Sequence, residues 1–180
     1  MASGPEASTR FPNDGFLNDP TELKQPMSKS IDERLSAQGV TLPVPAAPAA
    51  NYVAFTIEGG LLTISGQLPM ENGTLAVTGK LGAVVSLEDG QRAARLCAIN
   101  ILAQAQSALG DLGRIRRCVR LGGFVASTPD FVEQHKVING ASDLMATILG
   151  DAGKHARAAV GVASLPLDAA VEVEALFAID

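Results

Sequence analysis

Residues 155–179, HARAAVGVASLPLDAAVEVEALFAI, decide the fold of this chain. Small and β-branched residues fill the first part of this stretch, and apolar residues alternate with two glutamates in the second. Alternation with a period of two is typical of a β-strand that buries one face. The Leu-Pro-Leu-Asp sequence at 165–168 interrupts the pattern. We therefore predict two strands, over residues 157–163 and 170–179, joined by a turn.

A long amphipathic helix is predicted over residues 86–110. Apolar and small residues recur there at spacings of three and four, and polar side chains such as Gln104 fall mostly on the other side. Ser86 can cap the first turn of this helix, and Gly110 can end it. Its small-residue face suits close packing on a sheet.

A strand over residues 114–126 and a second helix over residues 128–149 follow. Thr128 is a good N-cap and Pro129 suits the first helical position, so we place the start of the helix there. Asn139-Gly140 is a weak point within it.

Three short strands are predicted at the beginning of the domain, over residues 52–58, 61–66 and 75–79. Gly59-Gly60 and Asn72-Gly73 lie between them, and both pairs suit tight turns that need positive φ.

The order of elements is βββαβαββ. It predicts an α+β fold with a mixed sheet of about six strands and two helices on one face. No further helix remains to cover the other face of the sheet. We therefore expect subunits to associate through it.

The N-terminal part divides into two segments. Residues 1–29 are rich in Pro, Ser, Asn, Asp and Gly without an apolar period, which predicts a flexible tail. Residues 30–50 predict a short helix, with Ser30 and Glu33 as a capping box, followed by a Pro/Ala linker. The compact domain is expected over residues 51–180.

Four arginines gather at the start of the strand predicted over 114–126. Strand alternation places Arg117 on one face and Arg114, Arg116 and Arg120 on the other. In an acidic chain such a group is more often a solvated or subunit-contacting strand end than a nucleic-acid surface.

The composition excludes several classes of partner. The chain has 180 residues, a formal net charge of −5 and only 4% aromatic residues, so neither a phosphate-binding surface nor a base-stacking platform is expected. No stretch is long and apolar enough to span a membrane, and no secretory signal is recognisable. Cys97 and Cys118 are expected as buried thiols in a reducing compartment. We predict a cytoplasmic protein that binds neither nucleic acid nor membranes.

The motifs of the common enzyme classes are absent. The sequence contains no GxGxxG, Walker loop, GxSxG, HExxH or paired Cys/His ligand spacing, and it predicts no metal and no cofactor. His135 and His155 are expected as separate surface histidines. Ser65 is most simply a strand-end serine bonded to the backbone. The residues alone leave an oligomeric α+β domain of unassigned chemistry.

Four segments, in this order, resemble the Rid/YjgF family of reactive-intermediate imine deaminases, many of which carry the name L-PSP endoribonuclease. They are AANYV at 49–53, TISGQLP at 63–69, HARAAVGV at 155–162 and LPLDAAVEVEA at 165–175. The resemblance extends from about residue 40 to the C-terminus. Asn-Gly-Ala-Ser after Ile138 and Gly-Lys-Leu-Gly at 79–82 look closer to a longer, less characterised branch.

The resemblance implies a chorismate-mutase-like fold, a homotrimer and a ligand site in each cleft between neighbouring subunits. It also implies hydrolysis of 2-imino acids or their enamine tautomers to 2-oxo acids and ammonia. Arg157 would bind the substrate carboxylate, Glu172 would accept a proton from the attacking water, and Asn139 would hold ligand or water. The other residues implied to line the cleft are Tyr52, Ser65 and Ala159.

One position departs from the family pattern. Compact deaminases usually carry a cysteine two residues after the arginine, where this chain has Ala159. The cleft would lose a thiol and gain room. Two alternatives stay open: a non-catalytic trimer that binds small carboxylates or a protein, and a ribonuclease. The acidic charge and the scarcity of aromatic residues weigh against the ribonuclease.

Overall fold

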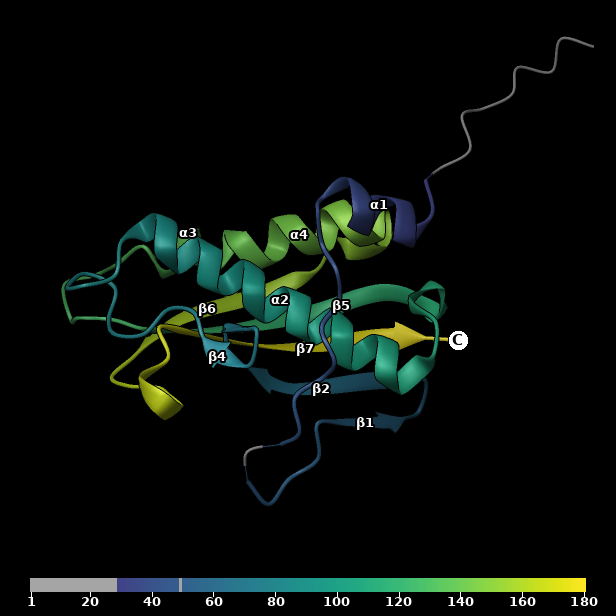
Figure 1. The fold of residues 1–180 in the computed structure, drawn as a ribbon, viewed down its shortest axis with the longest axis horizontal. Helices are drawn as coiled ribbons and strands as arrows, with labels where there is room; N and C mark the ends of the chain where they lie inside the picture. Colours follow the sequence, from purple (N-terminus) through teal and green to yellow (C-terminus); the bar gives the residue numbers. More distant parts are fainter. Residues whose placement is uncertain (1–28, 49) are drawn as a thin grey trace, which may run out of the picture.

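The computed structural model describes residues 29–48 and 50–180, and Figure 1 shows two layers. A five-stranded sheet with the strand order β1-β2-β7-β5-β6 carries the helices on one side. Strands β5 and β6 are parallel, and the other neighbouring pairs are antiparallel. The α+β class and the helix-covered face are confirmed. The tail predicted over residues 1–29 lies outside the described residues, except for Lys29.

Five strands form the main sheet and four helices accompany it. The strands are β1 (Phe55–Glu58), β2 (Leu61–Gln67), β5 (Ile115–Ala126), β6 (Ala156–Val162) and β7 (Val171–Ile179). The helices are α1 (Ile31–Ala37), α2 (Leu87–Leu109), α3 (Gln134–Val137) and α4 (Asn139–Leu149). Short 3-10 turns are η1 (Leu112–Arg114), η2 (Gly150–Gly153) and η3 (Pro166–Asp168). The three late strands begin and end within one residue of the predicted positions.

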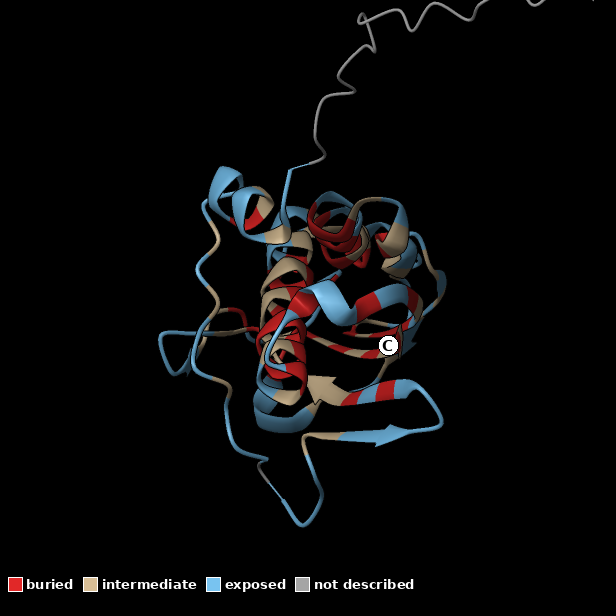
Figure 2. Cartoon of the chain, turned by 90° about the vertical axis from the view of Figure 1, so that its right-hand side faces the viewer, coloured by how far each residue is buried: buried red, intermediate tan, exposed pale blue. Residues whose placement is uncertain are grey.

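The hydrophobic core lies between the helices and the sheet, where Figure 2 shows the buried positions gathered. Small side chains let α2 lie close to β7. The buried alanines of α2 are Ala93, Ala94, Ala98, Ala103 and Ala105. Helix α4 also packs closely on α2, because a Cβ on Gly140 would lie 2.0 Å from the carbonyl oxygen of Gln91.

The turns and caps read from the sequence form as expected. Gly59 and Gly60 have φ values of 56° and 74° and close the β1–β2 hairpin. Ser86 Oγ accepts the N–H of Asp89 at 3.0 Å, and Gly110 ends α2 in the left-handed region with φ 77°.

The strand predicted over 75–79 does not join the main sheet, so the sheet has five strands rather than about six. Instead, β3 (Met70–Glu71) and β4 (Thr74–Leu75) form a separate two-stranded ribbon. Asn72 and Gly73, with φ values of 52° and 81°, make its turn.

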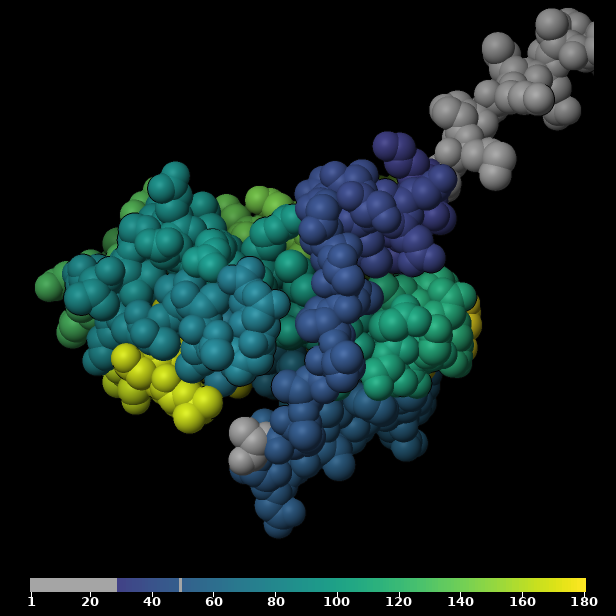
Figure 3. Space-filling model, viewed as in Figure 1, coloured from purple at the N-terminus to yellow at the C-terminus, as the bar shows by residue number. Residues whose placement is uncertain are grey.

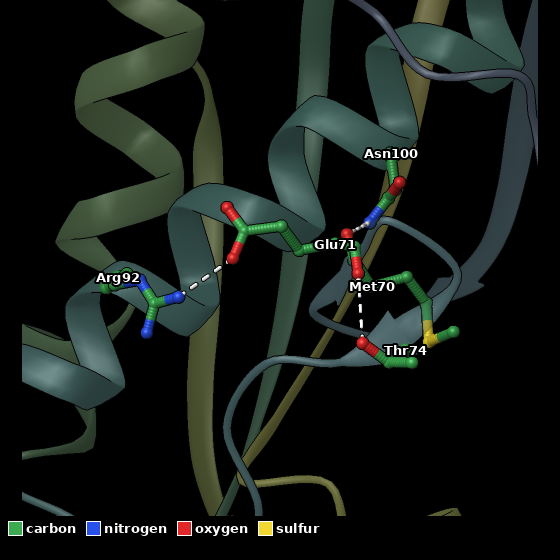
Figure 4. Close-up of polar contacts among 5 residues, drawn as sticks. All are labelled: Met70, Glu71, Thr74, Arg92 and Asn100. Carbon is green, nitrogen blue, oxygen red and sulfur yellow. Dashed lines mark hydrogen bonds and ion pairs between the residues drawn. The ribbon is translucent and has the colours of Figure 1, made fainter.

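Side chains of α2 hold this ribbon over the helix rather than beside the sheet. Asn100 Nδ2 donates to the carbonyl oxygens of Leu68 and Met70, each at 3.1 Å. Arg92 Nη2 donates to Glu71 Oε2 at 2.9 Å, and Figure 4 shows the contacts of Arg92 with Glu71 and of Asn100 with Met70. Asn100 and Arg92 thus attach the ribbon to α2.

The prediction that a helix starts at Thr128 is wrong. The N–H of Thr128 donates to the carbonyl oxygen of Leu81, and the N–H of Phe131 donates back to Thr128, so this stretch is a turn with Pro129 in it. Helix begins only at α3, and the chain breaks again at Ile138, one residue before the weak point expected from the sequence. Pro129 served the turn rather than the helix.

The predicted sorting of the arginines is also wrong. The β5–β7 register shifts between Ile115 and Arg117 and again between Cys118 and Arg120. Arg117 and Arg120 therefore pair with Ala178 and Leu176, both on the uncovered face. Two bulges overrode the simple alternation.

Residues 30–48 pack on the helical layer (Figure 1). Leu35 of α1 belongs to the core, and Arg34 Nη1 donates to the carbonyl oxygen of Ile148 in α4 at 3.0 Å. The capping box of Ser30 and Glu33 forms as predicted. Gln104, expected on the polar side of α2, is only 3% exposed, because its Nε2 donates to the carbonyl oxygen of Ala46 at 2.9 Å.

The helices of residues 29–48 and 50–180 leave the second face of the sheet uncovered (Figure 2). Apolar side chains on it remain partly open to solvent, including Leu61 at 40% and Val160 at 46% exposure. Within the same ranges, no helix has the length and apolar character needed to cross a membrane.

Candidate functional site

Arg157 connects β6 to α3 and α4 through three hydrogen bonds. Its Nη1 donates to Asn139 Oδ1 at 3.0 Å and to Ser142 Oγ at 2.9 Å, and its Nη2 donates to the carbonyl oxygen of His135 at 3.0 Å. These bonds use three of the five N–H donors of a guanidinium. The Nε–H and one Nη2–H have no partner among the described residues. Two donors therefore stay available for a planar carboxylate.

His155 extends this cluster. Its Nε2 lies 2.9 Å from Ser142 Oγ, and its Nδ1 lies 2.6 Å from the carbonyl oxygen of Gly153. A carbonyl oxygen can only accept, so Nδ1 carries a proton, and we assign the neutral tautomer, in which Nε2 is the acceptor. The Ser142 hydroxyl then donates to His155 and accepts from Arg157.

The three-residue spacing in helix α4 and the two-residue alternation along β6 bring these side chains together. Asn139 and Ser142 are three residues apart in α4 and share one face of that helix. His155, Arg157 and Ala159 alternate along the β6 segment and share the face that α3 and α4 cover. We name Asn139, Ser142, His155 and Arg157 the anion cluster.

Glu172 lies on the opposite face of the sheet from Arg157. Glu172 of β7 pairs with Phe124 of β5. Arg157 of β6 pairs with Leu121 of β5, which in turn pairs with Ala175 of β7. Leu121 and Ala175 are buried under the helices, and residues paired across strands point to the same face. One protomer therefore does not bring the expected carboxylate clamp and the expected acid into a single cleft.

The carboxyl group of Glu172 is half-buried on the uncovered face. Burial raises its pKa, and the nearby carboxylate of Glu174 raises it further. Glu174 itself has only a long ion pair, 3.9 Å, with Arg120. A carboxyl group with a raised pKa exchanges its proton closer to neutral pH, as a general base must.

Gly66 makes room for this carboxyl group. A Cβ on Gly66 would lie 1.8 Å from Glu172 Oε1, and the β2–β7 register shifts between Ile64 and Gln67 at this point. The bulge and the missing side chain let Glu172 lie directly over the backbone of β2. We name Gly66 and Glu172, with the neighbouring Ser65 and Tyr52, the acid cluster.

The remaining predicted site residues divide between the two clusters. Tyr52 is 50% exposed and lines a pocket of about 150 Å³ together with Gly66 and Leu167. Figure 3 shows the hollow between η3, in yellow, and the blue segment that leads to β1. Ser65 Oγ donates to the carbonyl oxygen of Val53 at 2.7 Å, which confirms the backbone-bonded interpretation. Ala159 packs against the core on the Arg157 face.

Sequence reasoning missed Ser142 and interpreted His155 wrongly. His155 is half-buried and bonded on both ring nitrogens instead of standing alone at the surface. The useful pattern was present: Ser142 lies three residues after Asn139, and His155 two residues before Arg157. Each partner therefore shared a face with a residue already singled out.

The described residues contain no group of three or more His, Cys, Asp or Glu side chains arranged to hold a metal ion. Cys97 and Cys118 are both buried free thiols, as predicted. Burial raises the pKa of Cys118 to about 12 and raises that of Cys97 well above its usual range. Neither thiol is therefore suited to act as a nucleophile.

Comparison with known proteins identifies the class to which this fold and these clusters belong. Residues 32–179 match the family model described as YjgF/chorismate mutase-like, a family of candidate endoribonucleases. The chain belongs to the YjgF/Rid family. The resemblance seen in the sequence and the chorismate-mutase-like fold are thus confirmed.

Three relatives show how far the similarity extends. Protein TCP17 of Trypanosoma cruzi is 50% identical over 83% of this chain and 94% of its own length. The structure of Atu1372, a protein of unknown function from Agrobacterium tumefaciens, is 62% identical, with a TM-score of 0.79 and coverage of 83% and 92%. A candidate endoribonuclease from Shewanella oneidensis is 36% identical, with a TM-score of 0.82 and coverage of 84% and 100%.

Proposed function

We propose that this protein hydrolyses reactive 2-imino acids, or their enamine tautomers, to 2-oxo acids and ammonia. The observation that carries the proposal is the anion cluster. Three protein acceptors hold the Arg157 guanidinium at the edge of the sheet, and two of its N–H donors remain for a carboxylate. A planar guanidinium with two free donors matches the carboxylate that all 2-imino acids carry.

Glu172 supplies the proton chemistry in this proposal. Its carboxylate takes a proton from water as the water oxygen bonds to the iminium carbon. The resulting carboxyl group returns that proton to the nitrogen of the tetrahedral intermediate. The carbon–nitrogen bond then breaks and ammonia leaves, while Glu172 takes the proton of the hydroxyl group as the carbonyl forms. The released ammonia accepts this proton and becomes ammonium. The raised pKa of Glu172 supports the proposed proton transfers, because its carboxylate is a stronger base than an ordinary glutamate carboxylate.

The proposed site needs two copies of the chain. Arg157 is on β6, at one edge of the sheet. Glu172 is on the uncovered face of β7, in the middle of the sheet, and Ser65 is on β2, next to the opposite edge strand. The two clusters meet if the β6 edge of one copy lies against the uncovered face of the next. Such a contact is head-to-tail and closes as a ring, and we propose the homotrimer that the family resemblance implies.

We also propose that the protein acts in the cytoplasm. Its two cysteines are free thiols, which suits a reducing compartment.

A second function is favoured by the separation of the clusters within one protomer. If the copies do not bring Glu172 to Arg157, the anion cluster alone is a binding site for small carboxylates without turnover. The alternative predicts saturable binding of a 2-oxo acid and no hydrolysis of any imine.

Ammonia release from 2-aminoacrylate, generated in place by a pyridoxal enzyme, tests the proposal. We expect the purified protein to accelerate release and Arg157→Ala to abolish the acceleration. Arg116→Ala is the matched control, because Arg116 is an exposed guanidinium paired with Asp180 at 3.6 Å, and it should keep full activity. Full activity of Arg157→Ala, or no acceleration by the native protein with any imino acid, would overturn the deaminase proposal. Cleavage of RNA that is lost in Arg157→Ala would favour the ribonuclease instead.

A further inference from the structure

Arg157 is held from behind by a directed chain of hydrogen bonds. The chain runs from Arg157 Nη1 to Ser142 Oγ, from the Ser142 hydroxyl to His155 Nε2, and from His155 Nδ1–H to the carbonyl oxygen of Gly153. The carbonyl group can only accept, so Nδ1 carries a proton, and in the neutral imidazole Nε2 is then left to accept from Ser142. Neither Ser142 nor His155 has a part in the proposed chemistry.

The direction of the chain matters for Arg157. With its own hydrogen given to His155 Nε2, the Ser142 hydroxyl keeps its lone pairs for the guanidinium. Without that acceptor, a serine inside a helix commonly turns its hydroxyl hydrogen to the carbonyl group four residues back, which is that of Ile138. The acceptor lone pairs would then leave Arg157.

The surroundings strengthen these contacts. The bonds from Arg157 to Asn139 and Ser142, and from Ser142 and His155 onward, are partly buried. Hydrogen bonds in such places are electrostatically stronger than in water and polarise one another along a chain. The chain is therefore able to hold a charged group in one orientation.

We propose that Ser142 and His155 are positioning residues that set the affinity of Arg157 for carboxylates. They hold the guanidinium so that both Nη1 hydrogens point into the protein, while Nε–H and one Nη2–H remain for the ligand. The inference rests on the carboxylate-binding role proposed for Arg157. It adds that a histidine which donates from Nδ1 to the carbonyl oxygen of Gly153 is part of that binding site without touching the ligand.

The first test measures the Kd of 2-oxobutyrate by calorimetry for the full-length protein and its variants. Ser142→Ala and His155→Ala should each weaken binding about tenfold, the size expected for losing one hydrogen bond to a charged group. His155→Gln should restore binding to within about threefold, because its side-chain oxygen can accept from Ser142 near the Nε2 position. Thr147→Ala is the matched control, since it removes an exposed hydroxyl group of helix α4, and that group donates to the carbonyl oxygen of Asp143 rather than to the anion cluster.

The second test reads the tautomer directly. Long-range ¹H–¹⁵N correlation spectra of the free protein should show His155 protonated on Nδ1 and bare on Nε2. In Ser142→Ala the Nε2 resonance should shift while thermal stability stays close to native. This signature would not follow from a role in packing alone.

The outcomes separate this inference from the proposed function. Native-like Kd values for Ser142→Ala and His155→Ala, or an Nε2–H tautomer, would overturn the positioning role while leaving deamination intact. Binding of 2-oxobutyrate without turnover would overturn the deaminase and leave the positioning role in place. No binding by the native protein would remove the carboxylate role of Arg157, and both proposals with it.

Discussion

The anion cluster and the acid cluster differ in how complete they are within one chain. Arg157 has three protein acceptors and is connected to two helices, so its orientation is set before any ligand arrives. Glu172 has no such support: it is a half-buried carboxyl group over a glycine, on a face that the described helices leave open. The anion cluster is therefore ordered by contacts within its own protomer, whereas no described helix covers the acid cluster.

In the proposed reaction, the difference would give the two clusters separate tasks. A preorganised guanidinium binds its ligand with little loss of entropy, because the side chain is already ordered. A poorly solvated carboxyl group gains basicity, which is what proton transfer needs. Substitutions in one cluster should therefore affect binding, and substitutions in the other should affect turnover.

The largest expected effect comes from removing the acid while keeping its shape. Glu172→Gln should lower kcat at least about a hundredfold, the contribution typical of a general base. The Kd of 2-oxobutyrate should stay within about threefold of native, because Arg157 is untouched. Steady-state ammonia release and calorimetry measure the two quantities. A joint loss of binding and turnover would show that the two clusters do not divide the work.

The next largest effect concerns the scaffold of the anion cluster. Gly140→Ala places a Cβ 2.0 Å from the backbone oxygen of Gln91, which can move only if α4 moves away from α2. We expect the free energy of unfolding to fall by about 2–3 kcal/mol, as in overpacked cores. Urea unfolding measures the loss. Gly73→Ser, in the exposed turn between β3 and β4, is the comparison, because nothing lies within 4 Å of a Cβ there, and its cost should come from backbone strain alone.

A smaller effect is expected from disturbing the carboxyl group of Glu172 without removing it. Gly66→Ala would push Glu172 Oε1 aside, since the new Cβ lies 1.8 Å from it, and turnover should fall about tenfold, the cost of losing one aligned contact. Gly122→Ala is the matched control, because its Cβ would lie 2.5 Å from Glu174 Oε1 instead. Equal losses in the two variants would argue against a special position for Glu172.

The smallest effect is a change in stability with pH. Because the pKa of Glu172 is raised in the folded protein, folding binds its proton more tightly, and this contribution is lost as the pH rises above the ordinary value of 4.5 and through the raised value. Glu172→Gln lacks the contribution, so its stability relative to native should increase over that range. Urea unfolding at a series of pH values measures the trend. Glu58→Gln controls for the loss of one exposed negative charge.

Much of the fold could be predicted from local sequence, but the exceptions have a common cause. Ser86, Gly110 and the Gly59-Gly60 pair act through their own neighbours, so their positions were correct. Thr128 and Pro129 could serve either a helix or a turn, and the choice depends on pairing with Leu81, far away in sequence. Local propensity does not contain that contact.

The candidate site was predictable to a similar degree. Arg157, Asn139 and Glu172 came from family resemblance, and the structure brings the first two together. That Glu172 faces away from Arg157 follows from the alternation of β7 and the register across β5, which requires knowing the neighbours of each strand. The bulges that turned Arg117 and Arg120 to one face were likewise invisible in the sequence.

The outer edge of β6 affects the solubility of the protein. Its strand, ARAAVGV, is paired with β5 on one side, and its sequence carries neither lysine nor proline to discourage a further strand. Apart from Arg157, whose guanidinium is bonded to α3 and α4, the side chains of this edge strand are small and uncharged, and such an edge is a template for aggregation. Solubility and the placement of Arg157 thus depend on the same strand, so in the proposed homotrimer a variant that weakens the contact between subunits should precipitate before it unfolds.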